Sequence, residues 1–142
     1  MGQVDLDLDA AVNRYIVSKV DLYTKIELGN SYHTGNTLAY TVQPTGPAVR
    51  YYNGIRKRTF SFAITAKHAK GMVALNTINA IMDVMEDATH VSIKSKNSSF
   101  KFINAKMTES AKFVATVQDD NNKDSQMYSV YQGVFSVEVI LI

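Results

Sequence analysis

A change in hydrophobic period at Gly71 constrains the fold of this chain more than any other feature. Before it, Phe60, Phe62 and Ile64 alternate with small or hydroxyl-bearing residues, as in a strand with one face against a core. After it, apolar residues recur every three or four positions, as in an amphipathic helix. This helical stripe contains Met72, Leu75, Ile78, Met82 and Met85, widened by Val73, Ile81 and Val84. We therefore expect a sheet covered by a helix over residues 69–88.

The other periodic segments extend this architecture over the 142 residues. Helical spacing predicts another helix over residues 5–25, ended by Gly29, and alternation predicts a short strand at 37–43 inside a passage rich in Gly and Pro. Later strands are expected at 100–107, 112–118 and 128–142. The last of these places Tyr131, Phe135, Val137, Val139 and Leu141 on one face. The sequence thus predicts one α+β domain, residues 1–142, with a mostly antiparallel sheet and two helices packed on one side.

A hairpin is expected where two β-rich runs, 48–52 and 59–67, flank Asn53 and Gly54. Asn-Gly favours a tight turn because both residues tolerate positive φ angles. The basic residues Arg56, Lys57 and Arg58 complete the connection between the runs. We interpret residues 48–67 as a long hairpin whose tip is basic.

Charge alternates in blocks along the chain although the net charge is only +2. Residues 50–70 carry six basic side chains and no acid, residues 83–87 carry −3, and residues 119–124 carry −2. Mixed patches suit contact with other proteins, whereas a dedicated nucleic-acid binder would be more uniformly basic. No stretch approaches the roughly 18 consecutive apolar residues of a membrane span, and the acidic N-terminus predicts no signal peptide.

No motif in the sequence indicates a chemical reaction. With no Cys, thiolate metal sites and cysteine nucleophiles are excluded, and His33, His68 and His90 lack the spacing of a metal site. Asp5, Asp7 and Asp9 copy the start of a calcium loop, but its glycine and its glutamate are missing. Since nucleophile elbows and phosphate loops are also missing, we expect no enzyme, no cofactor and no metal.

Several features, read in order along the chain, resemble tail terminator proteins of long-tailed bacteriophages. They are the amphipathic N-terminal helix, the passage rich in Gly and Pro, the Tyr-Tyr-Asn-Gly hairpin at 51–54, the Phe-x-Phe-x-Ile strand at 60–64, the methionine-striped helix and the terminal strands. The resemblance implies a virion structural protein, assembled in the host cytoplasm, that forms a hexameric ring at the head-proximal end of the tail. Its partners would be its own copies, the tail tube protein and a head-completion protein. DNA would only pass through the channel, and no membrane would be involved.

On this interpretation, two charged segments are expected to contact neighbouring subunits or partners. The basic one is the hairpin, with Arg50, Tyr51, Tyr52, Asn53, Arg56, Lys57 and Arg58, and the acidic one is the loop with Asp119, Asp120 and Asp124. Opposite charges on two loops would steer assembly more than hold it together. Two unrelated solvated loops are an equally good reading of the same residues.

Two other classes of function remain open at this stage. The chain could be a different tail structural protein, either the tail tube itself or a head–tail joining protein, which would differ in whether it polymerises. It could instead bind nucleic acid through residues 50–70, where tyrosines and bases lie together and could hold a single strand. Against the second reading, basic residues on an exposed strand more often serve to discourage aggregation of sheet edges.

Overall fold

The structure, a computed structural model, describes residues 7–28, 35–44, 49–50, 52–89, 91–118 and 127–141. The elements in chain order are α1 (Leu8–Lys19), β1 (Ile26–Leu28), β2 (Thr37–Pro44), β3 (Val49–Arg50), β4 (Arg56–His68), α2 (Gly71–Glu86), β5 (Phe100–Gln118) and β6 (Met127–Leu141). The strand order is β1-β2-β4-β6-β5, and β3 adds to β4. Only β1 and β2 pair in parallel, so the predicted α+β class with a mostly antiparallel sheet is confirmed.

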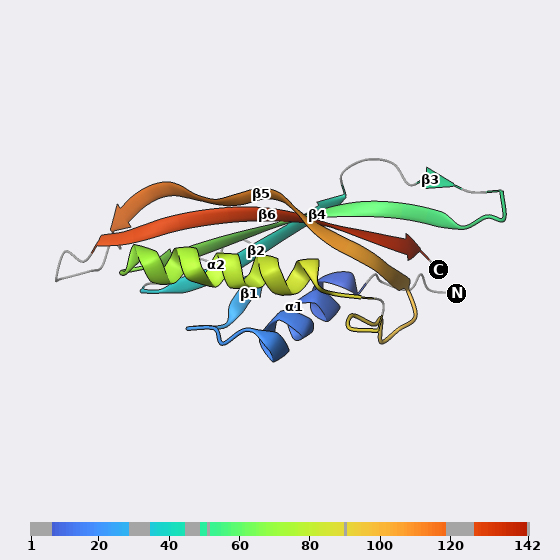
Figure 1. Ribbon diagram of the computed structural model, residues 1–142, viewed down its shortest axis with the longest axis horizontal. Coiled ribbons are helices and arrows are strands. Elements are labelled where there is room, and N and C mark those ends of the chain that lie inside the picture. Colours follow the sequence, from blue (N-terminus) through green and yellow to red (C-terminus); the bar gives the residue numbers. More distant parts are fainter. Residues whose placement is uncertain are drawn as a thin grey trace.

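Both helices lie on the same side of the sheet, which is elongated along β4, β5 and β6 (Figure 1). The alternation predicted for β4 is present, since Phe60, Phe62 and Ile64 are buried on the helix side. On β6, Phe135 lies opposite Phe62, and their rings stack with centroids 5.2 Å apart. This stacked pair forms the centre of the core between the sheet and the helices.

The helix α2 crosses the middle of the sheet at close range because β6 carries Gly133 there. A Cβ atom at Gly133 would lie 2.7 Å from both Ile78 Cγ2 and Met82 Cε. The stripe predicted for this helix is largely confirmed, with Ile78, Ile81, Met82 and Met85 buried. Met72 is an exception at 65% exposed, because the first turn of α2 extends toward the end of the sheet.

The first helix is shorter than the predicted span 5–25. It ends at Lys19, and Val20 already has an extended backbone. The apolar spacing continues beyond this point because Val20 and Tyr23 pack against the core from a turn rather than from a helix. The Tyr23 hydroxyl donates to the Thr37 carbonyl oxygen at 2.7 Å, and this bond holds the turn against β2. The spacing of apolar residues alone did not distinguish a continued helix from a turn that packs on the core.

The strands expected at 100–107 and 112–118 form one continuous strand, β5. Its pairing with β6 continues through the intervening residues, where Glu109 lies opposite Val134. Register shifts on both sides of Glu109 absorb the extra residues as bulges. The sequence prediction of a break was therefore wrong, because the interrupted alternation reflects an irregular strand and not a turn.

A polar clip that the sequence did not predict fixes the start of α1. Asp7 precedes the helix, but its carboxylate does not cap it. It accepts hydrogen bonds from Ser95 Oγ at 2.6 Å, the Lys96 amide at 2.8 Å and Ser99 Oγ at 3.0 Å. Burial alone would raise the pKa of Asp7, but these hydrogen bonds together outweigh it and lower the pKa. The clip joins the loop before β5 to the helix layer.

Candidate subunit interface

The predicted basic hairpin is present, and it projects from one end of the sheet (Figure 1). β3 pairs with the start of β4, so that Arg50 lies opposite Arg56. In the turn, Gly54 has a φ of +84°, and Asn53 Oδ1 accepts a hydrogen bond from the Ile55 amide at 3.2 Å. The turn chemistry is thus the one expected for Asn-Gly.

The basic residues Arg56, Lys57 and Arg58 lie inside β4. The sequence had predicted them in the connection between the two strands of the hairpin. Lys57 forms an ion pair with Glu138 at 3.8 Å. Arg58 has a buried Nε atom with no hydrogen-bond partner among the described residues. Arg50 and Arg56 are both exposed, and like charges directly opposite each other in a strand pair are unfavourable. The hairpin therefore carries an excess of positive charge that an anionic partner would relieve.

The tip of the hairpin is also apolar. The Tyr52 side chain is fully exposed, at 112%, and Ile55 is exposed at 38%. An exposed aromatic side chain beside arginines is the composition of binding hot spots in protein interfaces. Of the other predicted contact residues, Tyr51 lies outside the described residues.

The acidic contact residues Asp119, Asp120 and Asp124 also lie outside the described residues. The strands that flank this segment end at Gln118 and Met127, which are paired with each other. At the other end of β6, Leu141 pairs with Arg56 of the hairpin. The 15 residues of β6, at about 3.3 Å each, separate the two ends by roughly 45 Å. The basic hairpin and the last pair of β5 and β6 are thus at opposite ends of one subunit.

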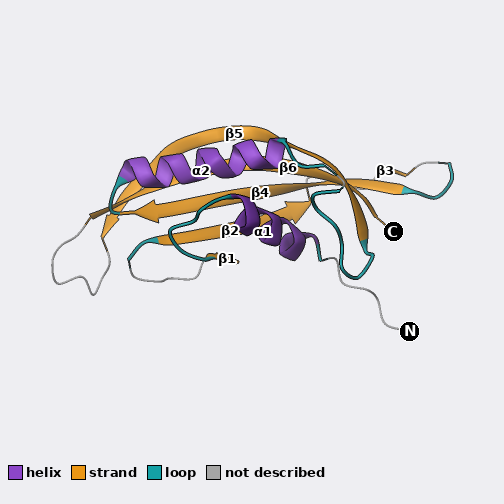
Figure 2. Ribbon diagram, turned by 60° about the horizontal axis from the view of Figure 1, so that its bottom comes forward, coloured by secondary structure: helices purple, strands orange, loops and turns teal. Residues whose placement is uncertain are grey.

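An exposed apolar surface accompanies that far end of the sheet. We define the distal strip as the side chains Met72, Phe113, Val114 and Met127, which are between 46% and 65% exposed. Phe113 contacts Tyr131 edge-on with centroids 5.6 Å apart, and Gly71, the neighbour of Met72, lies against the same tyrosine. The start of α2 and the distal half of β5 therefore meet in one apolar area at this end of the sheet (Figure 2).

The distal strip was missed by the sequence analysis. Met72 belonged to the helical stripe and Phe113 to an expected strand, and both were read as candidates for the core. The bulge between Phe113 and Ala115 breaks the alternation that assigns side chains to faces. The exposure follows from the position of β5 at the edge of the sheet, which the sequence pattern does not show.

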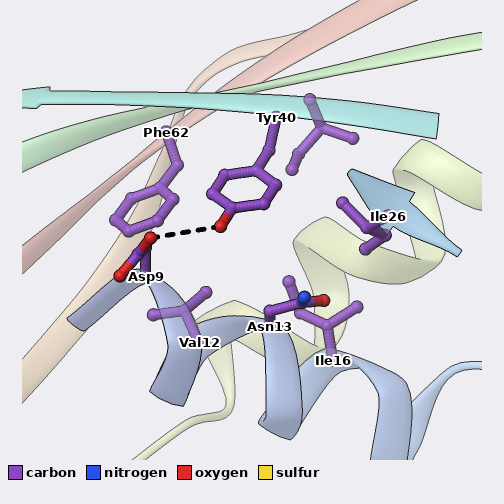
Figure 3. A pocket seen from close by; sticks show the side chains of 8 residues that line it. Asp9, Val12, Asn13, Ile16, Ile26, Tyr40 and Phe62 are labelled. Atoms are coloured by element: carbon purple, nitrogen blue, oxygen red, sulfur yellow. Dashed lines mark hydrogen bonds between the residues drawn. The ribbon is translucent and has the colours of Figure 1, made fainter. Parts of the chain in front are cut away.

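The hollow beneath α1 is core packing and not a ligand site. It measures about 10 Å³, which leaves room for at most one water molecule. Figure 3 shows its lining, in which the Tyr40 hydroxyl donates to Asp9 Oδ2 at 3.3 Å. Burial, together with the Asp9 carboxylate, raises the pKa of Tyr40 to about 12. Tyr40 is therefore a neutral hydrogen-bond donor that ties α1 to β2.

The described part of the chain offers no cluster of three His, Asp or Glu residues that could hold a metal ion. His68 packs edge-on against Tyr23, and its Nδ1 accepts a hydrogen bond from the Lys70 amide. Burial, and then the charge of Lys70, lower the pKa of His68. His33 and His90 lie outside the described residues. Within the described residues, no helix is both long and apolar enough to cross a membrane.

Comparison of the sequence with protein-family models and with curated proteins finds no match. The proposal below therefore depends on the resemblance described above and on the geometry of the two ends.

Proposed function

We propose that this chain is a virion structural protein that assembles into a ring at the head-proximal end of a phage tail. The ring, hexameric in the proteins that the sequence resembles, ends polymerisation of the tail tube and joins the tail to a head-completion protein. This role requires docking surfaces and no catalytic group. The resemblance of the hairpin and of the β4 sequence to tail terminators supports the specific role.

One observation supports the ring itself: two unlike contact surfaces lie at opposite ends of an elongated subunit. The basic hairpin with Tyr52 and Ile55 is at one end, and the distal strip is at the other, roughly 45 Å away. A surface that contacts a different surface on the next copy generates a head-to-tail series, which closes when the rotation allows. A single subunit cannot satisfy the contact within itself.

The chemistry of the two surfaces is complementary. Tyr52 and Ile55 would pack on Phe113 and Met72 of the next copy, which would bury apolar side chains that are exposed in the single subunit. Arg50 and Arg56 would approach the acidic segment that joins β5 to β6, whose sequence contains Asp119, Asp120 and Asp124. The apolar contact would supply most of the binding energy, and the charges would set partner and orientation.

The nucleic-acid reading of residues 50–70 receives less support from the geometry. The strand β4 divides its bases between the two faces of the sheet. Lys57 and Lys67 lie on the helix-free face, whereas Arg56 and Arg58 lie on the face of the buried residues. A continuous groove of bases and stacked aromatic rings, as single-strand binding requires, is not formed by the described residues. The reading as tail tube protein differs from the proposal only in polymerisation, which is measurable.

The test is the mass of the purified chain in solution, measured by light scattering over a concentration series, alone and with preformed tail tubes. A closed ring, or a monomer that becomes a ring at tube ends, is the expected result. Rings that stack into tubes would show a tube protein instead. A monomer that ignores tubes at every concentration would refute the proposal.

A matched pair of variants shows whether the hairpin is responsible. Arg50→Glu combined with Arg56→Glu should prevent ring formation, since it reverses the charge that meets the acidic segment. Lys19→Glu combined with Lys70→Glu changes the net charge equally on the helix side, and it should leave the ring intact. Equal loss of rings in both variants would remove the hairpin from the interface.

A further inference from the structure

The face of the sheet opposite the helices is lined by short side chains, lysines and half-buried aliphatic side chains of β6. No described helix covers it, since α1 and α2 both pack on the face that carries Phe62 (Figure 1). Residues paired across strands share a face, so the register identifies the members of this one. Its centre consists of Ala39, Thr41, Ser61, Ala63, Thr65, Gln132, Val134 and Ser136, and Val130 and Ile140 extend it along β6. The short side chains among these leave parts of the backbone open to close approach by a large partner.

The charges on this face have a positive excess. Its lysines are Lys57 and Lys67 on β4 and Lys101, Lys106 and Lys112 on β5. Its acids among the described residues are Glu27, Glu109 and Glu138. The excess of five lysines over three glutamates makes the face carry +2 per chain.

The partners of these lysines show which of them carry the excess. Glu138 pairs with Lys57 at 3.8 Å and Glu109 with Lys112 at 3.4 Å. Lys67 lies over the Tyr128 ring, 4.8 Å from its centroid. Lys101 and Lys106 are exposed, and neither forms an ion pair with a described residue. These two lysines are therefore the side chains most available to an anion.

The end of α2 has the opposite charge. Asp83, Glu86 and Asp87 are exposed at the end of α2, and the helix contains no basic residue. The helix-free face thus has a positive excess, whereas the end of α2 is acidic. An extended polyanion approaching the molecule would be steered to the sheet and away from this helix.

We propose that the helix-free face binds the phosphate backbone of double-stranded DNA, with Lys101 and Lys106 as its principal cations. Lysines act as mobile point charges that neutralise phosphates without reading bases, so the contact would be unspecific and salt-dependent. In the proposed ring this face turns toward the channel, and that placement rests on the proposed function. The affinity of the face for DNA is independent of the proposed function.

Two features of the face favour a duplex over other macromolecules. Single-strand binding needs stacking platforms, and the aromatic side chain that the register places here, Tyr128, is already covered by Lys67. A protein partner would be expected on exposed apolar side chains, but Met107 and Phe113 pair with Phe135 and Tyr131 and therefore lie on the helix side. What remains on this face is a cationic surface with hydroxyl-bearing and half-buried aliphatic side chains.

The experiment measures fluorescence anisotropy of a labelled 30-base-pair duplex of mixed sequence with the full chain, at several salt concentrations. The wild type should bind, with an affinity that falls steeply with salt. Lys101→Glu with Lys106→Glu should weaken binding at low salt by at least about tenfold and reduce the salt slope, since each phosphate contact contributes about 0.9 to it. The control variant Lys19→Glu with Lys70→Glu, which has the same net charge, should bind within about twofold of wild type.

Three results would overturn the inference: no binding by the wild type at low salt, equal loss in the two variants, or a loss confined to Arg50→Glu with Arg56→Glu. Light scattering on the same samples separates this inference from the proposed function. A ring that ignores the duplex would refute the DNA-binding face and leave the ring. A monomer that binds the duplex through Lys101 and Lys106 would retain the face and refute the ring.

Discussion

Two phenylalanines in this sheet show how differently its centre and its ends are built. Phe62, under the helices, is 1% exposed and stacks on Phe135, whereas Phe113, at the distal end, is 56% exposed and has only an edge contact with Tyr131. Both lie on the helix side of long strands. They differ because Phe62 lies on an inner strand under the helices, whereas Phe113 lies on β5, the edge strand, which has a neighbouring strand on one side only. The apolar side chains exposed at the distal end exceed what a stable core requires, which is why we assign them to contacts with other molecules.

The largest expected effect comes from removing these two rings separately. Phe62→Ala should lower the free energy of unfolding by about 3–5 kcal/mol, because it leaves a cavity in the core. Phe113→Ala should lower it by no more than about 1 kcal/mol, the value of an edge contact between aromatic rings. Urea denaturation of both variants measures the difference.

A Phe113→Ala variant as unstable as Phe62→Ala would contradict this division. It would show that the distal strip belongs to the core of the single subunit and is not reserved for a partner.

Gly133 tests how closely the helix approaches the sheet. Gly133→Ala should cost about 1–3 kcal/mol, because the added Cβ atom would lie 2.7 Å from Ile78 and Met82 side-chain atoms. Combined with Met82→Ala, it should cost less than the sum of the two single changes, since the shorter side chain makes room. Strict additivity in urea denaturation would show that α2 does not pack on Gly133.

The Asp7 clip tests a polar contact at the edge of the covered region. The pKa of Asp7 is lowered in the folded protein from its ordinary value of 3.8, so folding favours the ionised carboxylate. The stabilisation of the folded protein by the ionised Asp7 is complete above the pKa that Asp7 has in the unfolded chain. It is lost as the pH falls through the lower pKa of the folded protein. Asp7→Asn should destabilise the protein by about 1–2 kcal/mol at pH 7, and the difference from wild type should shrink in acid. A difference independent of pH would refute the ionised clip.

Ser136 gives the smallest expected effect, with the opposite sign. It is 5% exposed on the helix-free face, and its hydroxyl has no hydrogen-bond partner among the described residues. Ser136→Ala should therefore raise the free energy of unfolding by about 1 kcal/mol. Ser61→Ala, at the paired and less buried position, should change it by less than about 0.5 kcal/mol. Destabilisation by Ser136→Ala in thermal melts would show that the hydroxyl is hydrogen-bonded.

The sequence predicted the covered centre better than the ends. The alternation around Phe62 and the helical stripe through Met82 identify the core, because burial on one face imposes a period. The same reasoning failed at Val20, where a turn continues the helical spacing, and around Glu109, where bulges interrupt a strand that continues. The hydrophobic period of a segment does not show where the helix or strand ends or which part of the sheet a helix covers.

The candidate site was predicted only in part. The Asn53-Gly54 turn and the basic character of the hairpin are local properties of the sequence, and the structure contains both. The distal strip depends on the position of β5 at the edge of the sheet, and the facing of Arg50 and Arg56 depends on register. These are properties of the assembled sheet.

The most direct measurement of the central claim is the mass of a mixture of two blocked variants. Arg50→Glu with Arg56→Glu blocks the hairpin end, and Phe113→Glu blocks the distal end. If rings form by contact between unlike ends, each variant alone should be monomeric, while the mixture retains one intact contact and should form 1:1 dimers that do not grow. Light scattering of the mixture should thus give the mass of two chains. A mixture that stays monomeric, or a single variant that still forms rings, would contradict the account.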